Sequence, residues 1–425
     1  MQEKLLQFIW QHSLYNPGAL TTATGEPVTI TYPGRLNTNA GPDFLEAKIR
    51  VGNTVLVGHI ELHINNSDWN KHGHQHDAAY QNVILHVVYN KDNADELPSI
   101  PVIELSSHIP ASVIEQYAAL VNTTFQLPCA GRLDSIRDIT KESWLNRMLA
   151  ERWEEKLTSW KEQLDKSAGD WRNLLYWRLA ANFGFKINAD PFMATAQSLP
   201  VNILAKHHGN LMQIEALLFG QAGMLEKDFE EEYPNALKKE YAYLQQKYKL
   251  EPIPGHLWKF LRMRPANFPT VRMAQFAALV HKSFHLFSQI IEQHTLKEIL
   301  PLLEVTASEY WTTHFRFDEV QEVPSEKKLG RDSLHNIIIN TIAPIQFLYA
   351  TRQGESRLEE KALQLLEAVP AEKNNILAMW QEHGWKPASA GHSQALLQLF
   401  NNYCSKKRCL ECAIGLSILK GRPKE

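Results

Sequence analysis

Cysteine, long apolar runs and signs of secretion are scarce in this sequence. Only four cysteines occur in 425 residues, which excludes the disulfide-dense scaffolds of small secreted proteins. The most apolar stretch, 337–350, is interrupted by Asn340, Pro344 and Gln346, and it is shorter than the roughly 20 apolar residues that a membrane-spanning helix needs. Residues 1–15 contain neither a long apolar core nor a small-residue cleavage site, unlike a signal peptide. We therefore predict a cytoplasmic protein without a membrane contact.

A strong net charge is also absent. The formal net charge is −3, so the chain as a whole exerts no attraction on nucleic acid or on an anionic membrane. Contact with nucleic acid would need a local basic patch. Two sets of cations could follow a phosphate backbone, and they form the predicted nucleic-acid interface: Arg264, Arg272, Lys406, Lys407 and Arg408. A solvated helix face is the alternative for both sets, and nothing in the sequence identifies a protein partner.

Alternating apolar and polar residues between about 29 and 105 predict β-strands. The predicted strands cover residues 44–51, 55–64, 83–89 and 100–105. The first two are joined by Gly52-Asn53, a turn sequence, so they predict a hairpin. The other two are rich in valine and isoleucine, which favour strands.

Helical periodicity replaces this alternation from about residue 110 onward. Apolar residues in 142–165 recur near the 3.6-residue period of an amphipathic helix. Further helices are predicted at 170–184, 211–225, 228–248, 272–293, 358–368, 372–383 and 394–402, with short helices at the N-terminus and near 77–81. The sequence thus predicts a mixed α+β fold in which a small helix-plus-sheet core, residues 1–125, precedes a large all-α region, residues 126–425.

Histidines are concentrated on the predicted strands, where six of the 18 fall between His59 and His86. His59, Glu61 and His63 alternate along one strand, so their side chains project from the same face. A face of this composition suits metal binding or acid–base chemistry, and a solvated sheet face is the alternative. For the histidines of the following polar stretch the alternative is a mobile loop, and for His86 it is burial in the core.

A second carboxylate accompanies this group. Asp43 follows Pro42 at the start of the first hairpin strand, and Glu61 lies on the second. The hairpin can bring both close enough to share a divalent cation, since Mg²⁺ is usually held by one or two carboxylates with water and substrate phosphate. We therefore predict Mg²⁺ or Mn²⁺, with six candidate ligands: Asp43, Glu61, His59, Asp68, His72 and His74.

The order helix, three strands, helix and strand, with Pro42-Asp43 and Glu61-Leu62-His63 on its strands, resembles the core of the PD-(D/E)XK phosphodiesterases, a nuclease superfamily. The resemblance implies that Asp43 and Glu61 bind metal and activate water. It places His63 where the superfamily has a lysine. A histidine can orient or deprotonate a water, but it does not supply a permanent charge.

The whole chain also resembles an uncharacterised bacterial family known only as a domain of unknown function. The stretches that carry this resemblance are 39–44, 67–69 with His72 and His74, 82–89, 264–269 and 407–412. Because that family has no established activity, the resemblance implies architecture more than function.

Three of the four cysteines lie close together near the C-terminus. Cys404, Cys409 and Cys412 form a C-x4-C-x2-C arrangement, and Cys129 lies in the linker between the predicted domains. Four thiolates are the number that a tetrahedral zinc ion or an iron–sulfur cluster requires. Some PD-(D/E)XK nucleases hold an iron–sulfur cluster with a distant cysteine and a C-terminal trio, and the resemblance extends this expectation here. Plain burial of reduced cysteines is the alternative.

These observations support three hypotheses. The first is a metal-dependent phosphodiesterase acting on nucleic acid, in which Asp43 and Glu61 bind the metal and His63 orients the attacking water. The second is a non-catalytic binding or scaffold protein with a degenerate nuclease-like core. The third is a zinc-dependent hydrolase built from the histidines. The first requires that Asp43, Glu61 and His63 converge on one ion.

Overall fold

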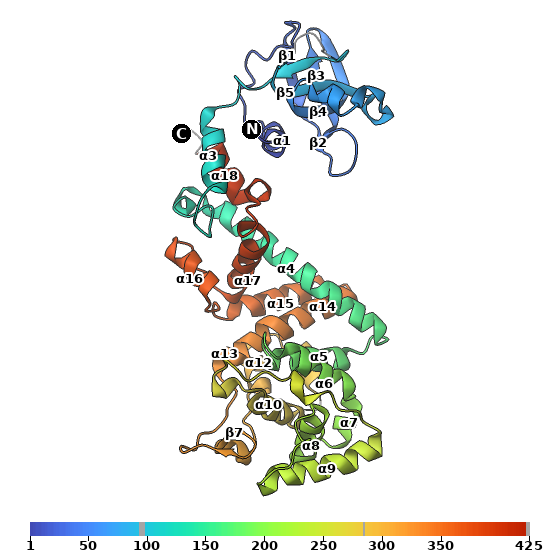
Figure 1. The fold of residues 1–425 in the computed structure, drawn as a ribbon, viewed down its shortest axis with the longest axis vertical. Helices are drawn as coiled ribbons and strands as arrows, with labels where there is room; N and C mark the ends of the chain where they lie inside the picture. Colours follow the sequence, from blue (N-terminus) through green and yellow to red (C-terminus); the bar gives the residue numbers. More distant parts are fainter. Residues whose placement is uncertain (93–97, 284, 422–425) are drawn as a thin grey trace. The chain divides into compact units, whose positions relative to one another are not determined.

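The computed structural model describes residues 1–92, 98–283 and 285–421, and Figure 1 shows their helices and strands. The chain divides into two compact units. The sheet unit comprises Met1–Trp144, Glu382–Trp385 and Leu399–Glu425, and the helical unit comprises Leu145–Gln381 and Lys386–Gln398. The fold is mixed α+β, with a mixed sheet near the N-terminus and a large helical region after it, as predicted. The predicted domains, 1–125 and 126–425, stay a prediction, because compactness does not test which parts fold alone.

One six-stranded sheet forms the centre of the sheet unit. Its strands are β1 (Val28–Tyr32), β2 (Arg35–Leu36), β3 (Phe44–Val51), β4 (Thr54–Asn65), β5 (Val83–Asn90) and β6 (Val102–Glu104). They follow the order β1-β3-β4-β5-β6, with β2 paired to β3. The antiparallel pair β3 and β4 confirms the predicted hairpin, whereas β4, β5 and β6 run parallel. Parallel pairing of consecutive strands requires a crossover connection, which here joins β4 to β5.

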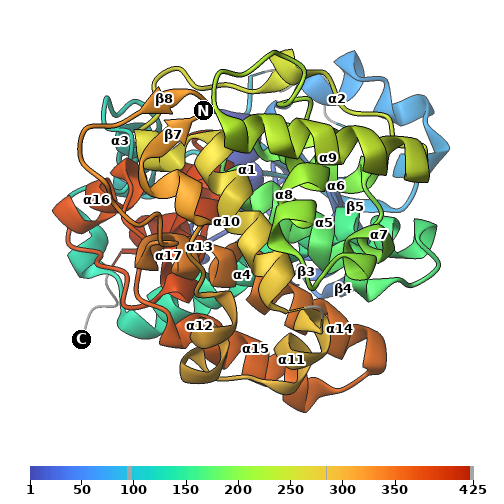
Figure 2. The ribbon, with the colours of Figure 1, turned by 90° about the horizontal axis from the view of Figure 1, so that it is seen from below.

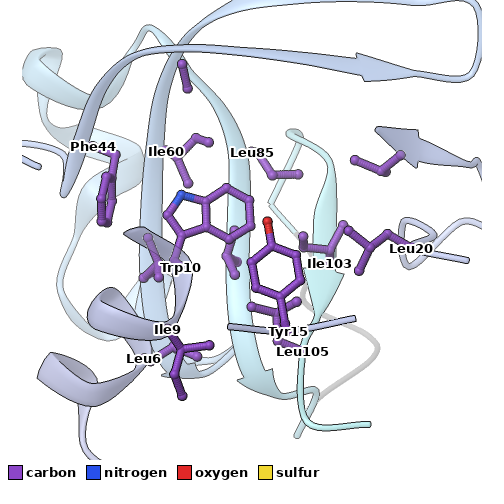
Figure 3. Packing of buried hydrophobic residues seen from close by; sticks show 14 of the residues in the cluster. Leu6, Ile9, Trp10, Tyr15, Leu20, Phe44, Ile60, Leu85, Ile103 and Leu105 are labelled. Carbon is purple, nitrogen blue, oxygen red and sulfur yellow. The ribbon is translucent and has the colours of Figure 1, made fainter. Parts of the chain in front are cut away.

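The N-terminal helix packs against one face of this sheet. The helix, α1 (Glu3–Gln11), was predicted from the sequence, and it buries Leu6, Ile9 and Trp10. Figure 3 shows these side chains packed with Ile60 of β4 and Leu85 of β5. Burial of each such side chain stabilises the fold by about 1.5–3 kcal/mol, so this core holds the two strands firmly from one side.

A β-bulge in β3 sets the position of Asp43, the residue directly before that strand. The register between β3 and β4 shifts between Phe44 and Ala47, and Glu46 has a left-handed φ of 59°. Because a bulge adds one residue to the strand, Phe44 and Ala47 both lie in the core although they are three positions apart. Regular alternation would place them on opposite faces. Asp43, directly before Phe44, then lies beside Glu61 of β4.

The crossover from β4 to β5 folds into short helical turns. It contains α2 (Asp68–Lys71) and the 3-10 helices η1 (His74–His76) and η2 (Ala78–Tyr80). Only the last of these coincides with a predicted helix, near 77–81. The carboxylate of Asp68 accepts a hydrogen bond from the backbone N–H of Asn65 at 3.0 Å, which fixes the chain as it leaves β4.

The helical unit contains most of the predicted helices. Its elements are α5 (Trp171–Phe183), α6 (Ala189–Ser198), α7 (Val201–Lys206), α8 (Leu211–Gln221), α9 (Glu232–Tyr248), α10 (Pro269–Lys282), α11 (Leu286–Glu292), α12 (Leu296–Leu303), α13 (Arg331–Ile337), α14 (Ala343–Gln353), α15 (Ser356–Ala368), the strands β7 (His314–Arg316) and β8 (Glu319–Val320), and most of α4 (Asp138–Lys166), α16 (Asn375–Glu382) and α17 (Ala390–Leu399). The sheet unit also holds α3 (Ala111–Val121) and α18 (Ala413–Lys420). In Figure 2, α8 lies beside α9 and α10 and packs against both.

The helix predicted over 272–293 is two helices, because the backbone is extended at Ser283, where φ is −144°.

The most apolar stretch of the sequence is buried within the helical unit. Residues 337–350 form the end of α13, a π-helical turn (Ile338–Ile342) and most of α14. The wider turn directly precedes α14, whose second residue, Pro344, has no backbone N–H to donate to a regular helix. Among the residues that the structure describes, none of the helices has the length and apolarity to cross a bilayer.

One carboxyl group is buried among these helices. Glu215 of α8 is only 1 % exposed. It accepts hydrogen bonds from the hydroxyl of Tyr233 and, at 2.7 Å, from that of Ser308. Burial raises the pKa of the Glu215 carboxyl to about 7. The folded protein therefore binds a proton at Glu215 more tightly than the unfolded chain does.

We expect Glu215→Gln to flatten the pH dependence of stability. In the wild type, the stabilisation from this group is complete below its ordinary pKa of 4.5 and is lost as the pH rises through about 7. The loss amounts to about 3 kcal/mol, and glutamine has no proton to lose. Urea unfolding at about pH 5 and about pH 8 measures the difference in unfolding free energy. If the unfolding free energy changed equally between these two pH values in the wild type and in Glu215→Gln, Glu215 would not be protonated in the folded protein.

Candidate metal site on the sheet

Three titratable side chains lie together on the sheet face that points away from α1. Glu61 and His63 come from β4, and His86 comes from β5. Because the two strands pair in parallel with Glu61 opposite His86, all three side chains project from the same face. They are nevertheless buried: Glu61 is 5 % exposed, His63 2 % and His86 0 %. The face is thus a covered polar site and not the solvated surface that alternation also allowed.

The crossover covers this face and adds two imidazoles. Gly73 has a φ of 73°, in the left-handed region that favours glycine. The turn at Gly73 directs the flanking residues His72 and His74 back toward His63. His72 is exposed and His74 is partly buried, so the site meets solvent at His72.

His63 is the centre of the group. Its Nε2 lies 3.1 Å from Nδ1 of His72 and 3.4 Å from Nε2 of His74. The same atom lies 3.6 Å from Oε1 of Glu61, and Nε2 of His74 lies 3.3 Å from that oxygen. Three imidazole nitrogens thus lie within 4.8 Å of one another, and a carboxyl oxygen of Glu61 lies beside two of them. We call Glu61, His63, His72 and His74 the histidine–glutamate cluster.

His86 orients the central imidazole from the inner side. Nδ1 of His63 lies 2.9 Å from Nε2 of His86. When Nδ1 of His63 donates this hydrogen bond, its Nε2 carries no proton and directs a lone pair toward the cluster. Burial and the neighbouring histidines lower the pKa of His63 to about 3 and the pKa of His86 to about 4. Both rings are therefore neutral at neutral pH, which is the form in which imidazole binds metals.

Asp43 lies directly beside Glu61. Its backbone N–H donates to Oε2 of Glu61 at 3.0 Å, and its own Oδ2 accepts from the backbone N–H of Leu62 at 3.0 Å. The side-chain amide of Gln7 in α1 donates to Oδ1 of Asp43 at 2.8 Å. Burial raises the pKa of Asp43 to about 6, and burial together with the charge of Asp43 raises the pKa of Glu61 to about 8. Two neighbouring carboxyl groups with raised pKa values favour a nearby cation.

Two aromatic side chains of the crossover enclose the imidazoles. Tyr80 stacks on His74 with ring centroids 3.9 Å apart. The buried ring of Trp69 lies 5.4 Å from the ring of His74 and 5.2 Å from that of His86. These contacts restrict rotation of the imidazoles. Neither aromatic residue was predicted at the site, and their only signal in the sequence is their presence in an otherwise polar stretch.

The cluster has dimensions that suit a tetrahedral transition-metal ion. A zinc ion with Zn–N distances of about 2.0–2.1 Å places its ligand atoms about 3.3–3.4 Å apart. The separations of His63 Nε2 from the nitrogens of His72 and His74 are 3.1 and 3.4 Å. Imidazole suits zinc and related transition metals, whereas Mg²⁺ prefers oxygen ligands. Glu61 is close enough to be a fourth ligand or to accept a proton from a water in that position.

Comparison with known families places the chain in one of them. A family model described as "protein of unknown function (DUF2851)" matches residues 3–375. The chain belongs to this family. The match confirms the predicted membership of a family of unknown function, and it includes the histidine–glutamate cluster but not the C-terminal cysteines. No curated protein and no solved structure matches the chain.

Two of the predicted metal ligands in this DUF2851 chain make local contacts instead. Nδ1 of His59 accepts a hydrogen bond from the backbone N–H of Glu46 at 3.4 Å. Asp68 holds the backbone of the crossover, and its carboxylate pairs with Lys71 at 2.9 Å. Of the predicted ligands, the structure therefore brings Glu61, His72 and His74 together around His63. Asp43 lies beside Glu61.

The predicted cations differ in exposure. Arg272 is buried in the helical unit, where its guanidinium donates to Ser333 at 3.1 Å and lies over the ring of Phe185. Because these contacts hold Arg272 inside the unit, it cannot reach a phosphate backbone. Arg264, Lys406 and Lys407 are exposed and remain predicted contacts, whereas the half-buried Arg408 pairs with Glu411.

The four cysteines meet within the sheet unit. All are buried and none is in a disulfide. Cys129 and the C-terminal trio of Cys404, Cys409 and Cys412 line one cavity. The structure thus brings Cys129 to the C-terminal trio, although among the described residues no three cysteines have their sulfurs within 4.8 Å of one another.

We expect the histidine–glutamate cluster to bind Zn²⁺. His72→Ala removes an exposed ligand at little cost to folding, so it should weaken zinc binding beyond the about 10–100-fold effect of losing an outer-shell partner. His76→Ala is the matched control, because His76 is an exposed histidine of η1 outside the cluster. Isothermal titration of the metal-free proteins measures both affinities. Equal zinc affinity in the wild type and His72→Ala would contradict this assignment.

Proposed function

We propose that the protein is a metal-dependent hydrolase that cleaves phosphodiester bonds and uses the histidine–glutamate cluster as its metal centre. The observation that carries the proposal is the grouping of three imidazoles, whose nitrogens lie within 4.8 Å of one another, with the carboxyl group of Glu61 beside two of them. Three protein ligands leave the fourth position of a tetrahedral ion to water, which is the arrangement of catalytic and not of structural zinc sites.

A bound Zn²⁺ would lower the pKa of its water to about 7 and polarise a phosphoryl oxygen. Glu61 lies beside His63 and His74, where it would reach a water on the metal, and its raised pKa makes it a stronger base than an ordinary carboxylate. Asp43 raises that pKa further by its charge, and it fixes the orientation of Glu61 through its backbone N–H. His86 can accept a hydrogen bond from Nδ1 of His63, which would leave Nε2 of His63 free for the metal.

These roles differ from those predicted from the sequence. There, Asp43 and Glu61 bind the metal and His63 orients the water. In the proposal, His63 is a ligand and Glu61 accepts the proton of the water, while Asp43 is a positioning residue. The histidine at the lysine position of the resembled superfamily is then accounted for, because a neutral imidazole can bind a metal and a lysine ammonium cannot.

The choice of a phosphodiester rests on the arrangement of the sheet unit. A helix precedes the β3–β4 hairpin, Asp43 stands at the start of β3, and Glu61-Leu62-His63 lies on β4 before the parallel strand β5. This order is similar to the PD-(D/E)XK core, whose members cleave phosphodiester bonds. The resemblance supports the substrate class, and the geometry of the cluster supports the reaction.

We expect the zinc-loaded protein to hydrolyse bis-(p-nitrophenyl) phosphate, single-stranded DNA or RNA. Glu61→Gln should lower kcat by about 10²–10⁴-fold, the usual contribution of a general base, while zinc affinity changes much less. His72→Ala should lose zinc and activity together and recover activity at high zinc concentration. His76→Ala should match the wild type.

Other outcomes separate the remaining hypotheses. Hydrolysis of an ester or peptide without any phosphodiesterase activity would retain the zinc-dependent hydrolase and reject the substrate class. Zinc bound at the cluster with no hydrolysis of any probe would support the non-catalytic binding protein. Phosphodiesterase activity that persists in both Glu61→Gln and His72→Ala would place the reaction elsewhere.

A further inference from the structure

Four thiols from distant parts of the chain meet in one cavity of the sheet unit. Cys129 lies in the turn after α3, and Cys404 ends the π-helical turn that follows α17. Cys409 begins the 3-10 helix Cys409–Glu411, and Cys412 is the residue before α18. Apart from Arg408, the cavity is lined by Leu120, Pro128, Tyr403, Ile414 and Gly415, so the thiols are its principal ligand atoms.

Neither disulfide formation nor chemical reactivity explains why these four cysteines lie at one cavity. They are free thiols, and each of the four is at most 8 % exposed. Neutral, buried thiols are poor nucleophiles. A metal changes this balance, because a coordinated thiol gives up its proton to the solvent.

We propose that Cys129, Cys404, Cys409 and Cys412 hold an iron–sulfur cluster. The C-x4-C-x2-C spacing with a fourth cysteine far away in the sequence is the ligand spacing of plant-type ferredoxins. The spacing alone does not show where the fourth cysteine lies. In the structure, Cys129 lines the same cavity as the other three cysteines. The inference is independent of the proposed hydrolase, since it concerns other residues and another chemistry.

The spacing of the thiols favours a cluster over a single zinc ion. A zinc ion bound by four thiolates at about 2.3 Å holds its sulfurs about 3.8 Å apart. Among the described residues, no three cysteines have their sulfurs within 4.8 Å of one another. A cluster accommodates wider separations, because its thiolates bind different metal atoms that bridging sulfides join.

The surroundings also suit an anionic cluster. The sulfur of Cys412 accepts hydrogen bonds from the backbone N–H groups of Ile414 and Gly415, at the start of α18. Lys407 lies close enough to Cys409 to favour its thiolate electrostatically. A side chain at Gly415 would meet the carbonyl oxygen of Cys409 at 2.0 Å, so only glycine allows α18 to approach the cysteine turn this closely. Hydrogen bonds and charges of this kind stabilise sulfur ligands and tune cluster potentials.

A cluster at this place would tie the C-terminal segment to the N-terminal part of the chain. Leu410, between Cys409 and Cys412, packs against the same core as Leu6 and Ile9 of α1. Lys407 donates to the backbone carbonyl of Val121 at the end of α3. The four cysteines would therefore close a long loop of the chain, which restricts the unfolded state more than a short loop does.

The test is incorporation of iron and sulfide into the full-length protein under anaerobic conditions, followed by desalting. We expect the wild type to retain iron and acid-labile sulfide in equal amounts, to absorb visible light and to gain thermal stability. Cys129→Ser and Cys412→Ser should each retain less than about a tenth of the iron. Ser405→Ala is the matched control, because Ser405 is exposed between Cys404 and Cys409. It should behave as the wild type does.

A second measurement avoids any folding defect of the cysteine variants. In the loaded wild type, all four thiols should resist alkylation together, and all should react after the iron is removed by a chelator. Zinc retained without sulfide would overturn the proposal, as would disulfides among these cysteines. Iron binding that survives in both cysteine variants would overturn it as well.

Discussion

The parallel pairing of β4 with β5 is the constraint on which the sheet unit depends. It places Glu61 opposite His86 and aligns His63 with them on one face. It also requires a crossover, because two parallel strands cannot be joined by a tight turn. That crossover carries His72 and His74, and its left-handed turn at Gly73 returns both imidazoles to the sheet. The connection that the topology demands therefore supplies the rest of the cluster.

β4 has one apolar and one polar face, and both are buried. Hydrogen bonds among the polar groups offset the free energy that their burial costs. Ile60 and Leu62 join the core with α1, whereas Glu61 and His63 are buried among polar groups. Buried polar groups are costly unless they are hydrogen-bonded, and here the backbone N–H of Asp43 and the ring of His86 provide partners. Gln7 links the two sides, since it lies on α1 and donates to Asp43.

The sheet unit is assembled from both ends of the chain, and the helical unit is inserted between them in the sequence. Its two candidate centres differ in ligand type. Imidazole and carboxylate suit zinc and related ions, whereas thiolates suit softer centres such as iron–sulfur clusters. The proposed metal centre and the proposed cluster would thus be chemically distinct within one compact unit.

The sequence by itself determined the hairpin, the amphipathic helices and the face shared by Glu61 and His63, because these follow from local periodicity. It also indicated four thiolates by number and spacing. Only the tertiary structure decided that His86 belongs with His63, since pairing between strands is non-local. The bulge at Glu46 placed Asp43 beside Glu61, and Trp69 and Tyr80 reached the imidazoles through the crossover. The meeting of Cys129 with the C-terminal trio is likewise tertiary, because periodicity carries no information about residues that are brought together only when the whole unit packs.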